Sequence, residues 1–305
     1  MDRLDAFHTF VTVAEAGGFS AAARKLRLSP AAVTRSVAAL EAELGVQLFR
    51  RTTRVVALTE EGSRFLVSAR RILADTEASM AGVREMDTAL RGNLVVTAPV
   101  MFGNLYVAPL LLSFLRSHPE VRARSLLLDR VVDLVAEGVD VAVRIAHLRD
   151  STLRAAKVGA VRRVVGASPG YLAANGTPER ARHLRGHHVI LFAQGEPPRE
   201  WTFTRGRSTT RVPIDPRLVT NSTETSLRAA MAGRGITRAL SYQVASDVRA
   251  GRLVVVLPQL EPPPIPVHVV HTAGAEAPAR VRAFVDHAVS KLRADERLDA
   301  DRWLG

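Results

Sequence analysis

The chain has 305 residues, 47% of them apolar and 24% charged, which allows about two domains with a substantial core and excludes wholesale disorder. It contains no cysteine, which excludes a disulfide framework, thiolate zinc sites and cysteine nucleophiles, and fits a reducing compartment. The formal net charge is +12, and all but three of the 42 bases are Arg, a skew that fits either a GC-rich genome or a polyanionic partner.

The N-terminus does not read as a targeting segment. Acidic residues flank the single early Arg, and no long apolar stretch follows it, so a secretory signal is not expected. No apolar run approaches the ~20 residues that a membrane-spanning helix needs. We therefore expect a cytoplasmic protein without membrane contacts.

Three helices are predicted within the first 45 residues. The first covers residues 2–16, the second begins at a Ser20 cap, and the third begins at a Ser29 cap with Pro30 in its first turn and ends at Gly45. This order of helix, turn, short helix, tight turn and helix is the helix-turn-helix plan, whose second motif helix enters a DNA major groove.

A wing and a long helix are predicted next. Residues 46–58 read as two short strands joined by Arg50–Arg54, and Thr59 caps a helix that extends to about Leu90. Apolar and small residues recur along this helix at heptad spacing, which indicates a dimerisation seam. The alternative is an amphipathic helix that packs on its own domain. The predicted dimerisation residues are Leu66, Ala69, Leu73, Thr76, Met80 and Val83.

Basic residues are clustered rather than confined to one domain. Residues 20–71 carry a net charge of +6, residues 1–91 carry only +2, and residues 92–305 carry +10. Charge balance alone therefore does not place a polyanion site at the N-terminus, although the local cluster fits one.

Strands alternate with helices after residue 92. Strands are predicted at 94–97, 124–128, 140–143, 161–167, 188–192 and 267–271, and helices at 103–117, 130–137 and 278–293. This βαβ order predicts an α/β domain with an open parallel sheet. The proline-rich run at 262–266 marks a chain crossing or hinge.

Several segments resemble LysR-type transcriptional regulators. The DNA-binding signature lies in the run FSAAARKLRLSPAAVTRSVAALEAELGVQLFRR at 19–51 and in LTEEG at 58–62. Later matches are GNLVVTAP at 92–99, DVAVRI at 140–145 and NSTE at 221–224. The resemblance implies a winged helix-turn-helix, a linker helix that dimerises, and a two-lobed effector domain like the periplasmic binding proteins.

The resemblance also implies an organisation into three parts. We expect DNA binding from residues 1–58, a linker and dimerisation helix at 59–91, and an effector domain at 92–305. Within the last part, the first lobe covers about 92–162 and 267–305, and the second about 163–266. The implied function is effector-modulated transcription regulation by a dimer or tetramer on double-stranded DNA, with contact to RNA polymerase; the alternative is a constitutive regulator with a degenerate effector domain.

The third helix and the wing carry the predicted DNA contacts. Arg35 is the candidate for a paired contact to guanine, and the alternative is a phosphate contact without sequence information. The wing arginines suit phosphates or a narrow minor groove, and the alternative is a solvated loop. The complete set is Ser29, Pro30, Ala31, Ala32, Thr34, Arg35, Ser36, Arg50, Arg51 and Arg54.

The effector site is expected between the lobes. The family commonly places a polar residue where the helix after the first strand begins, but Val100 and Met101 stand there, which favours a larger aromatic or alicyclic effector or a degenerate site. Alternatively, Met101 and Phe102 are ordinary core residues. Arg144 follows a strand end and either pairs with an anion or ties the lobes together. The expected effector residues are Pro99, Val100, Met101, Phe102, Arg144, Phe192, Thr223, Gly235 and Ile236.

Rival functions have little support in the sequence. The close His pairs, His187-His188 and His268 with His271, point to opposite faces of a strand, and no dinucleotide, phosphate-loop or nucleophile-elbow motif occurs. We therefore expect neither an enzyme nor a bound cofactor or metal. A free solute-binding protein needs an export signal, and an architectural DNA binder whose C-terminal part binds nothing remains a third reading.

Overall fold

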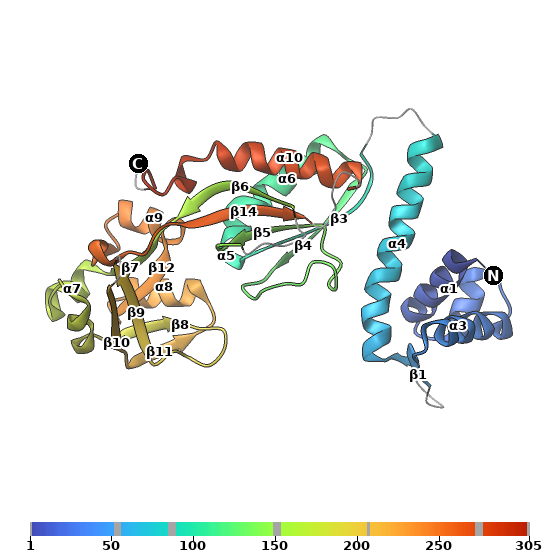
Figure 1. The fold of residues 1–305 in the computed structure, drawn as a ribbon, viewed down its shortest axis with the longest axis horizontal. Helices are drawn as coiled ribbons and strands as arrows, with labels where there is room; N and C mark the ends of the chain where they lie inside the picture. Colours follow the sequence, from blue (N-terminus) through green and yellow to red (C-terminus); the bar gives the residue numbers. More distant parts are fainter. Residues whose placement is uncertain are drawn as a thin grey trace.

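The structure is a computed structural model that describes residues 2–51, 56–84, 90–148, 154–205, 208–271 and 277–303. A small helical N-terminal domain, a single long helix and a two-lobed α/β body follow one another along the chain (Figure 1).

The N-terminal domain begins with three helices whose ends follow local capping chemistry. They are α1 (Arg3–Ala16), α2 (Phe19–Leu26) and α3 (Pro30–Leu44). The Ser29 hydroxyl accepts a hydrogen bond from the Ala32 amide at 3.1 Å, and Gly45 ends α3 at a φ of 68°. Both predicted ends of the third helix are thus confirmed. The predicted Ser20 cap is wrong, because α2 begins at Phe19, and its N-cap is Gly18, two residues earlier, which provides no side-chain hydrogen bond.

The three helices enclose one apolar core. Phe10, Val13, Ala22, Val33 and Val37 are fully buried in it. Strands β1 (Phe49–Arg51) and β2 (Val56–Leu58) pair antiparallel and form the predicted wing, but Arg50 and Arg51 belong to β1 and not to the connection between the strands.

Helix α4 (Glu60–Arg84) leaves the wing directly. The Thr59 hydroxyl accepts from the Gly62 amide at 2.8 Å, which confirms the predicted cap. Its 25 described residues make a rod about 37 Å long at 1.5 Å per residue. A Cβ at Gly62 would lie 2.0 Å from the Leu48 carbonyl oxygen, so only glycine allows the helix to approach the wing this closely.

The first lobe is built on a five-stranded sheet in the order β4-β3-β5-β14-β6. Strand β3 runs parallel to β4 and β5, whereas β14 runs antiparallel to β5 and β6, so the sheet is mixed and the predicted open parallel sheet is wrong. Strand β14, which lies between β5 and β6, enters the sheet after the chain has returned from the second lobe. A local βαβ pattern does not reveal this pairing. The bounds are β3 (Gly92–Ala98), β4 (Val121–Leu127), β5 (Val141–Ile145), β6 (Arg154–Val161) and β14 (Ile265–His271).

Two long helical stretches pack on this sheet. The first is continuous through α5 (Val100–Phe102), the π-helical turn η1 (Gly103–Val107) and α6 (Ala108–Ser117); the second is α10 (Ala279–Arg293). Among the described helices, Val100–Ser117 alone is long and apolar enough to cross a membrane by length and composition, a more apolar stretch than the sequence reading anticipates. Phe102, Tyr106 and Phe114 of this stretch are buried in the core of the lobe, whereas Leu105 and Leu112 are exposed.

The helix predicted at 130–137 is wrong. These residues form turns, in which the Asp133 carboxylate accepts hydrogen bonds from the amides of Val135 and Ala136, each at 3.0 Å. A short acidic side chain that bonds its own neighbouring amides competes with the helical hydrogen bonds, so the turn is favoured.

The second lobe has its own five-stranded sheet in the order β11-β8-β12-β7-β13, again mixed. The single strand predicted at 161–167 is two strands, because the chain leaves the first lobe at β6 and enters the second at β7. The strands are β7 (Arg163–Ala167), β8 (Val189–Phe192), β11 (Pro216–Thr220), β12 (Ile236–Leu240) and β13 (Val254–Val256).

A hairpin and several helices cover the second sheet. The hairpin consists of β9 (Glu200–Arg205) and β10 (Ser208–Pro213). The helices are α7 (Pro169–Asn175), α8 (Thr223–Met231) and α9 (Ser241–Arg249), with short 3₁₀ turns η2 (Ala181–Gly186) and η3 (Pro258–Leu260).

The chain crosses between the lobes more often than the sequence predicts. It passes over between β6 and β7 and returns between β13 and β14 through the proline-rich run. After the 3₁₀ turn η4 (Glu296–Leu298) it crosses again, because Leu298 is buried in the first lobe and Trp303 in the core of the second. Residues 267–305 are expected in the first lobe, but the C-terminal segment contacts both lobes.

Candidate functional site

The N-terminal turns of α3 present an open surface. Ser29, Pro30, Ala31 and Arg35 are exposed, and Ala32 and Thr34 are half-buried. Within the described residues Arg35 has no ion-pair partner, so its guanidinium is free to meet a phosphate or a base edge.

Ser36 does not belong to this surface. It is 2% exposed, and its hydroxyl has no hydrogen-bond partner among the described residues. The prediction of a DNA contact is wrong here, because Ser36 falls on the core stripe with Val33, Val37 and Leu40 at helical spacing. The sequence holds this signal, since the position lies three residues after one core valine and directly before the next.

A buried carboxylate holds the wing against α3. Glu41 is 4% exposed, and its Oε1 accepts from the amides of Leu48 and Phe49 at 2.8 and 3.1 Å. Sequence reasoning missed this role, although a glutamate among core positions of a helix is its signal. Arg50, exposed on β1, follows these two residues directly. The Arg51 side chain and Arg54 lie outside the described residues.

The predicted dimerisation stripe on α4 is partly engaged within the chain. Ala69 is fully buried in the N-terminal core, and Leu66 and Leu73 pack against the same core, so Ala69 is a core residue and not a contact with a second chain. The Thr76 hydroxyl donates to the Ile72 carbonyl. Met80 and Val83 lie on α4, but their side chains are outside the described set.

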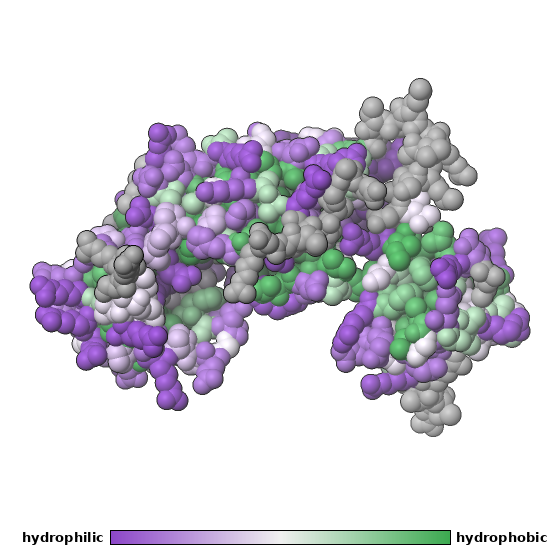
Figure 2. Space-filling view, viewed as in Figure 1, coloured by the Kyte–Doolittle hydropathy of each residue, from purple (hydrophilic) through white to green (hydrophobic). Residues whose placement is uncertain are grey.

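An apolar face remains on the outside of this part of the molecule. Ile72 of α4 is 41% exposed, and Figure 2 shows apolar surface over α4 and the adjoining helices. A contiguous apolar patch, unlike a single exposed apolar residue, marks a contact surface.

A cavity of about 510 Å³ lies between the two lobes. Its size is typical of a pocket for a small organic molecule. The first lobe contributes Pro99, Asp129 and Ile145, and the second contributes polar, charged and aromatic residues that include Arg163, Phe192, Trp201, Thr223, Arg238 and Tyr242.

Three of the expected effector residues, Pro99, Phe192 and Thr223, line this cavity. The residues that follow Pro99 on α5 lie elsewhere. Phe102 is fully buried in the first-lobe core, so its predicted effector contact is wrong, and Met101 packs between the cores of the two lobes. Large apolar side chains are more often buried in a core than exposed in a pocket, which explains the positions of Phe102 and Met101.

Val100 is exposed and does not line the cavity. Its amide, at the start of the helix, already donates to the Asp129 carboxylate at 2.9 Å. A carboxylate of the protein itself therefore occupies the amide that an anionic ligand would use at this helix start.

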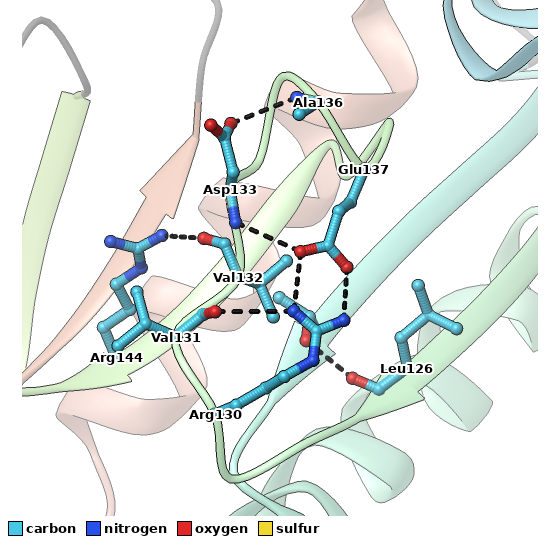
Figure 3. Close-up of polar contacts among 9 residues, drawn as sticks. Leu126, Arg130, Val131, Val132, Asp133, Ala136, Glu137 and Arg144 are labelled. Atoms are coloured by element: carbon cyan, nitrogen blue, oxygen red, sulfur yellow. Dashed lines mark hydrogen bonds and ion pairs between the residues drawn. The ribbon is translucent and has the colours of Figure 1, made fainter. Parts of the chain in front are cut away.

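The Arg144 side chain forms its hydrogen bond within the protein. Its guanidinium donates to the Val132 carbonyl at 2.6 Å and so ties β5 to the turn at 130–137 (Figure 3). The same turn is closed by a paired contact from Arg130 to the Glu137 carboxylate at 2.7 and 2.6 Å. Arg144 does not line the cavity, so neither the predicted ligand contact nor the predicted tie between lobes is observed; the tie lies within the first lobe.

Gly235 and Ile236 serve the second sheet rather than the cavity. Ile236 is fully buried in the lobe core, so the prediction of a ligand contact is wrong. Gly235 has a φ of 151°, and a Cβ there would lie 2.4 Å from the His188 carbonyl oxygen. The glycine therefore allows β12 to approach β8.

The cavity also contains a charged group that the sequence did not reveal. The Arg238 guanidinium lies over the rings of Trp201 and Phe203, 4.5 and 4.2 Å from their centroids, and donates to the Thr202 carbonyl at 3.0 Å. Burial, and secondly the charge of Arg163, lowers the pKa of Arg238 to about 10. The aromatic hairpin and the strand are far apart in sequence, so no local pattern indicates this contact.

Tyr242 forms the wall of the cavity between the lobes. It belongs to α9 but packs in the first-lobe core, with its ring 5.3 Å from that of Phe102 and 5.9 Å from that of Tyr106. Burial raises the pKa of the Tyr242 hydroxyl above its ordinary value, so the group is a neutral hydrogen-bonding phenol.

Comparisons with known proteins agree with this architecture. Residues 4–63 match the family model of the bacterial regulatory helix-turn-helix protein, lysR family, and residues 87–293 match that of the LysR substrate binding domain. The transcriptional regulator PtxR of Pseudomonas aeruginosa is 34% identical over 284 residues, which cover 93% of this chain and 91% of PtxR.

Solved structures give the same result. CrgA, a LysR-type transcriptional regulator from Neisseria meningitidis, is 31% identical with a TM-score of 0.60, and the match covers 94% of this chain and 98% of that one. Full-length LysG from Corynebacterium glutamicum, whose structure holds a bound effector Arg, shares the fold at a TM-score of 0.66 and 21% identity, over 95% and 99% of the two chains. The chain belongs to the LysR-type transcriptional regulators, DNA-binding proteins whose activity is modulated by an effector bound in the C-terminal domain.

Proposed function

We propose that this regulator reads DNA with the exposed start of α3 and holds the backbone with its wing. The single observation that carries this assignment is Arg35, exposed at the second turn of α3 without an ion-pair partner among the described residues. A guanidinium in this place is suited to a paired contact with guanine O6 and N7. Arg50, and the arginines at 51 and 54, supply phosphate contacts from the wing.

The proposed working unit is a dimer, or a tetramer formed by two dimers, in the cytoplasm. Ile72 on α4, together with the stripe at Thr76, Met80 and Val83, supplies the contact, because the more N-terminal stripe residues pack on their own domain. Two recognition helices on one face of DNA require half-sites separated by multiples of ~34 Å. A changed DNA bend or contact with RNA polymerase then transmits the regulatory signal.

The proposed division of labour follows the fold. Residues 1–58 bind DNA, 59–91 link and dimerise, and 92–305 bind the effector in the cavity between the lobes, a small organic molecule with an aromatic or alicyclic body. The cavity favours this over a constitutive regulator, because its volume and its converging polar groups are those of a ligand site.

Footprinting of the full chain on DNA selected from its own genome tests this proposal. A protected region with half-sites at the stated spacing, which changes when a cavity ligand is added, is the expected result. Protection that never changes with any ligand would support the constitutive alternative, and the absence of any preferred sequence would remove the assignment of α3.

A further inference from the structure

Two arginines face the cavity from neighbouring strands of the second lobe. Arg163 on β7 pairs with Leu240 on β12, two residues after Arg238, so both guanidinium groups project from the same face of the sheet. Both line the cavity, and Arg163 is exposed at the first position of its strand. This places two positive charges at one end of the interlobe space.

Neither charge has a carboxylate partner within the ranges that the structure describes. In the described part of the chain no carboxylate pairs with Arg163 or Arg238, and the one hydrogen bond that those residues provide to the Arg238 side chain comes from the Thr202 carbonyl. The Trp201 and Phe203 rings hold the Arg238 guanidinium in a fixed plane, which leaves N–H donors available. A half-buried, oriented and unpaired guanidinium is suited to bind an anion.

The cavity also contains negative charge. Asp129, from the first lobe, carries a carboxylate whose Oδ1 accepts from the Val100 amide. Glu200, which lines the cavity from β9 of the second lobe, forms an ion pair with Arg211 at 3.5 Å, so its charge is offset. An anionic group is therefore repelled from the helix start and attracted to the second lobe.

We infer that the effector is an organic monoanion whose carboxylate binds Arg238 and Arg163 of the second lobe while its apolar body contacts Phe192 and Trp201. This inference rests on the proposed function and specifies the ligand class of the same cavity. The carboxylate from the first lobe disfavours a second negative charge on the ligand. The apolar lining, with Pro99, Ile145 and Leu191, favours an aromatic or similarly compact body.

Benzoate is the probe, and benzamide is its uncharged isostere. Calorimetric titration of the full chain is expected to show benzoate binding, with benzamide about 10- to 100-fold weaker, the difference that one or two charge-assisted hydrogen bonds produce. Arg238→Gln and Arg163→Gln should each weaken benzoate by about 10-fold or more. Because Arg163 is exposed, its variant tests the inference even if the Arg238 variant does not fold.

Two further variants sharpen the test. Asp129→Asn keeps an acceptor for the Val100 amide but removes the negative charge, so benzoate should bind more tightly. Arg234→Gln removes an exposed positive charge of the second lobe that does not line the cavity, and it should leave benzoate affinity unchanged.

Equal affinity for benzoate and benzamide, benzoate binding that survives both cavity variants, or no benzoate binding at all would overturn the inference. The proposed function fails separately. A neutral compound that binds and changes the footprint would leave the proposed function intact while this inference falls, whereas a chain that selects no DNA sequence would remove the proposed function whatever benzoate does.

Discussion

Replacing Glu41 by Ala should release the wing from the recognition helix. The Glu41 Oε1 accepts from two amides, those of Leu48 and Phe49, and both residues are at most 2% exposed. Without the carboxylate, two buried donors lose their partner, and each unsatisfied donor costs about 1–3 kcal/mol. The local free energy of opening should therefore fall by about 2–6 kcal/mol.

Hydrogen exchange measured by mass spectrometry on the intact chain reports this opening directly. A loss of 2 kcal/mol corresponds to about 30-fold faster exchange in the segment 46–58. Affinity for selected DNA should fall as well, because Arg50 lies on β1, the strand that begins at Phe49. Glu41→Gln retains an acceptor without the charge, so its exchange rate in this segment should lie between those of the Ala variant and the native chain.

The matched control is Glu43→Ala, two residues further along the same helix. Glu43 is half exposed and pairs with Arg3 at 2.6 Å on the surface, so its removal should cost less than about 1 kcal/mol. If the two Ala variants show the same exchange in the wing, the buried carboxylate does not hold it and the reasoning is refuted.

Three other substitutions test separate parts of the structure. Arg35→Ala should cost about 1–3 kcal/mol at one base position, measured as the ratio of operator to random-DNA affinity; an equal loss on both would make Arg35 a phosphate contact. Ile72→Asp should give monomers in sedimentation, since it places a charge on an exposed apolar face without disturbing the core, and a persistent dimer would put the interface elsewhere. Trp303→Ala should destabilise the second lobe by about 3–5 kcal/mol, visible as a lower Tm, because the ring is 6% exposed in that core; an unchanged Tm would show that the tail does not hold the lobe.

The ends of the DNA-binding elements could be predicted because their causes are local. Ser29, Gly45 and Thr59 each act on amides or carbonyls within four residues, so the sequence alone contains the interaction. The errors occur where a neighbouring group competes, as at Asp133, or where the partner is distant, as for β14, which completes a sheet whose other strands lie more than 100 residues earlier.

The residues of the cavity also differ in whether a local sequence pattern indicates them. Phe192 and Thr223 were accessible to prediction, since they follow from the positions of strand ends and helix starts. Asp129 carries the same signal, because it comes two residues after the end of β4. Arg238 has no such signal, because the ring that holds its guanidinium, that of Trp201, lies on a hairpin far from it in the sequence.

The packing around the cavity constrains how a ligand could act on DNA binding. Tyr242 of the second lobe is buried in the first-lobe core and Met101 of the first lobe packs against the second, so the lobes are interlocked behind the cavity. Separation of the lobes would therefore have to break these contacts. A ligand that contacts both lobes favours the closed arrangement only through the contacts that closure adds. Because α4 contacts the first lobe near Gly138, through the Val67 side chain, we expect the first lobe to transmit a ligand-dependent change to the linker helix.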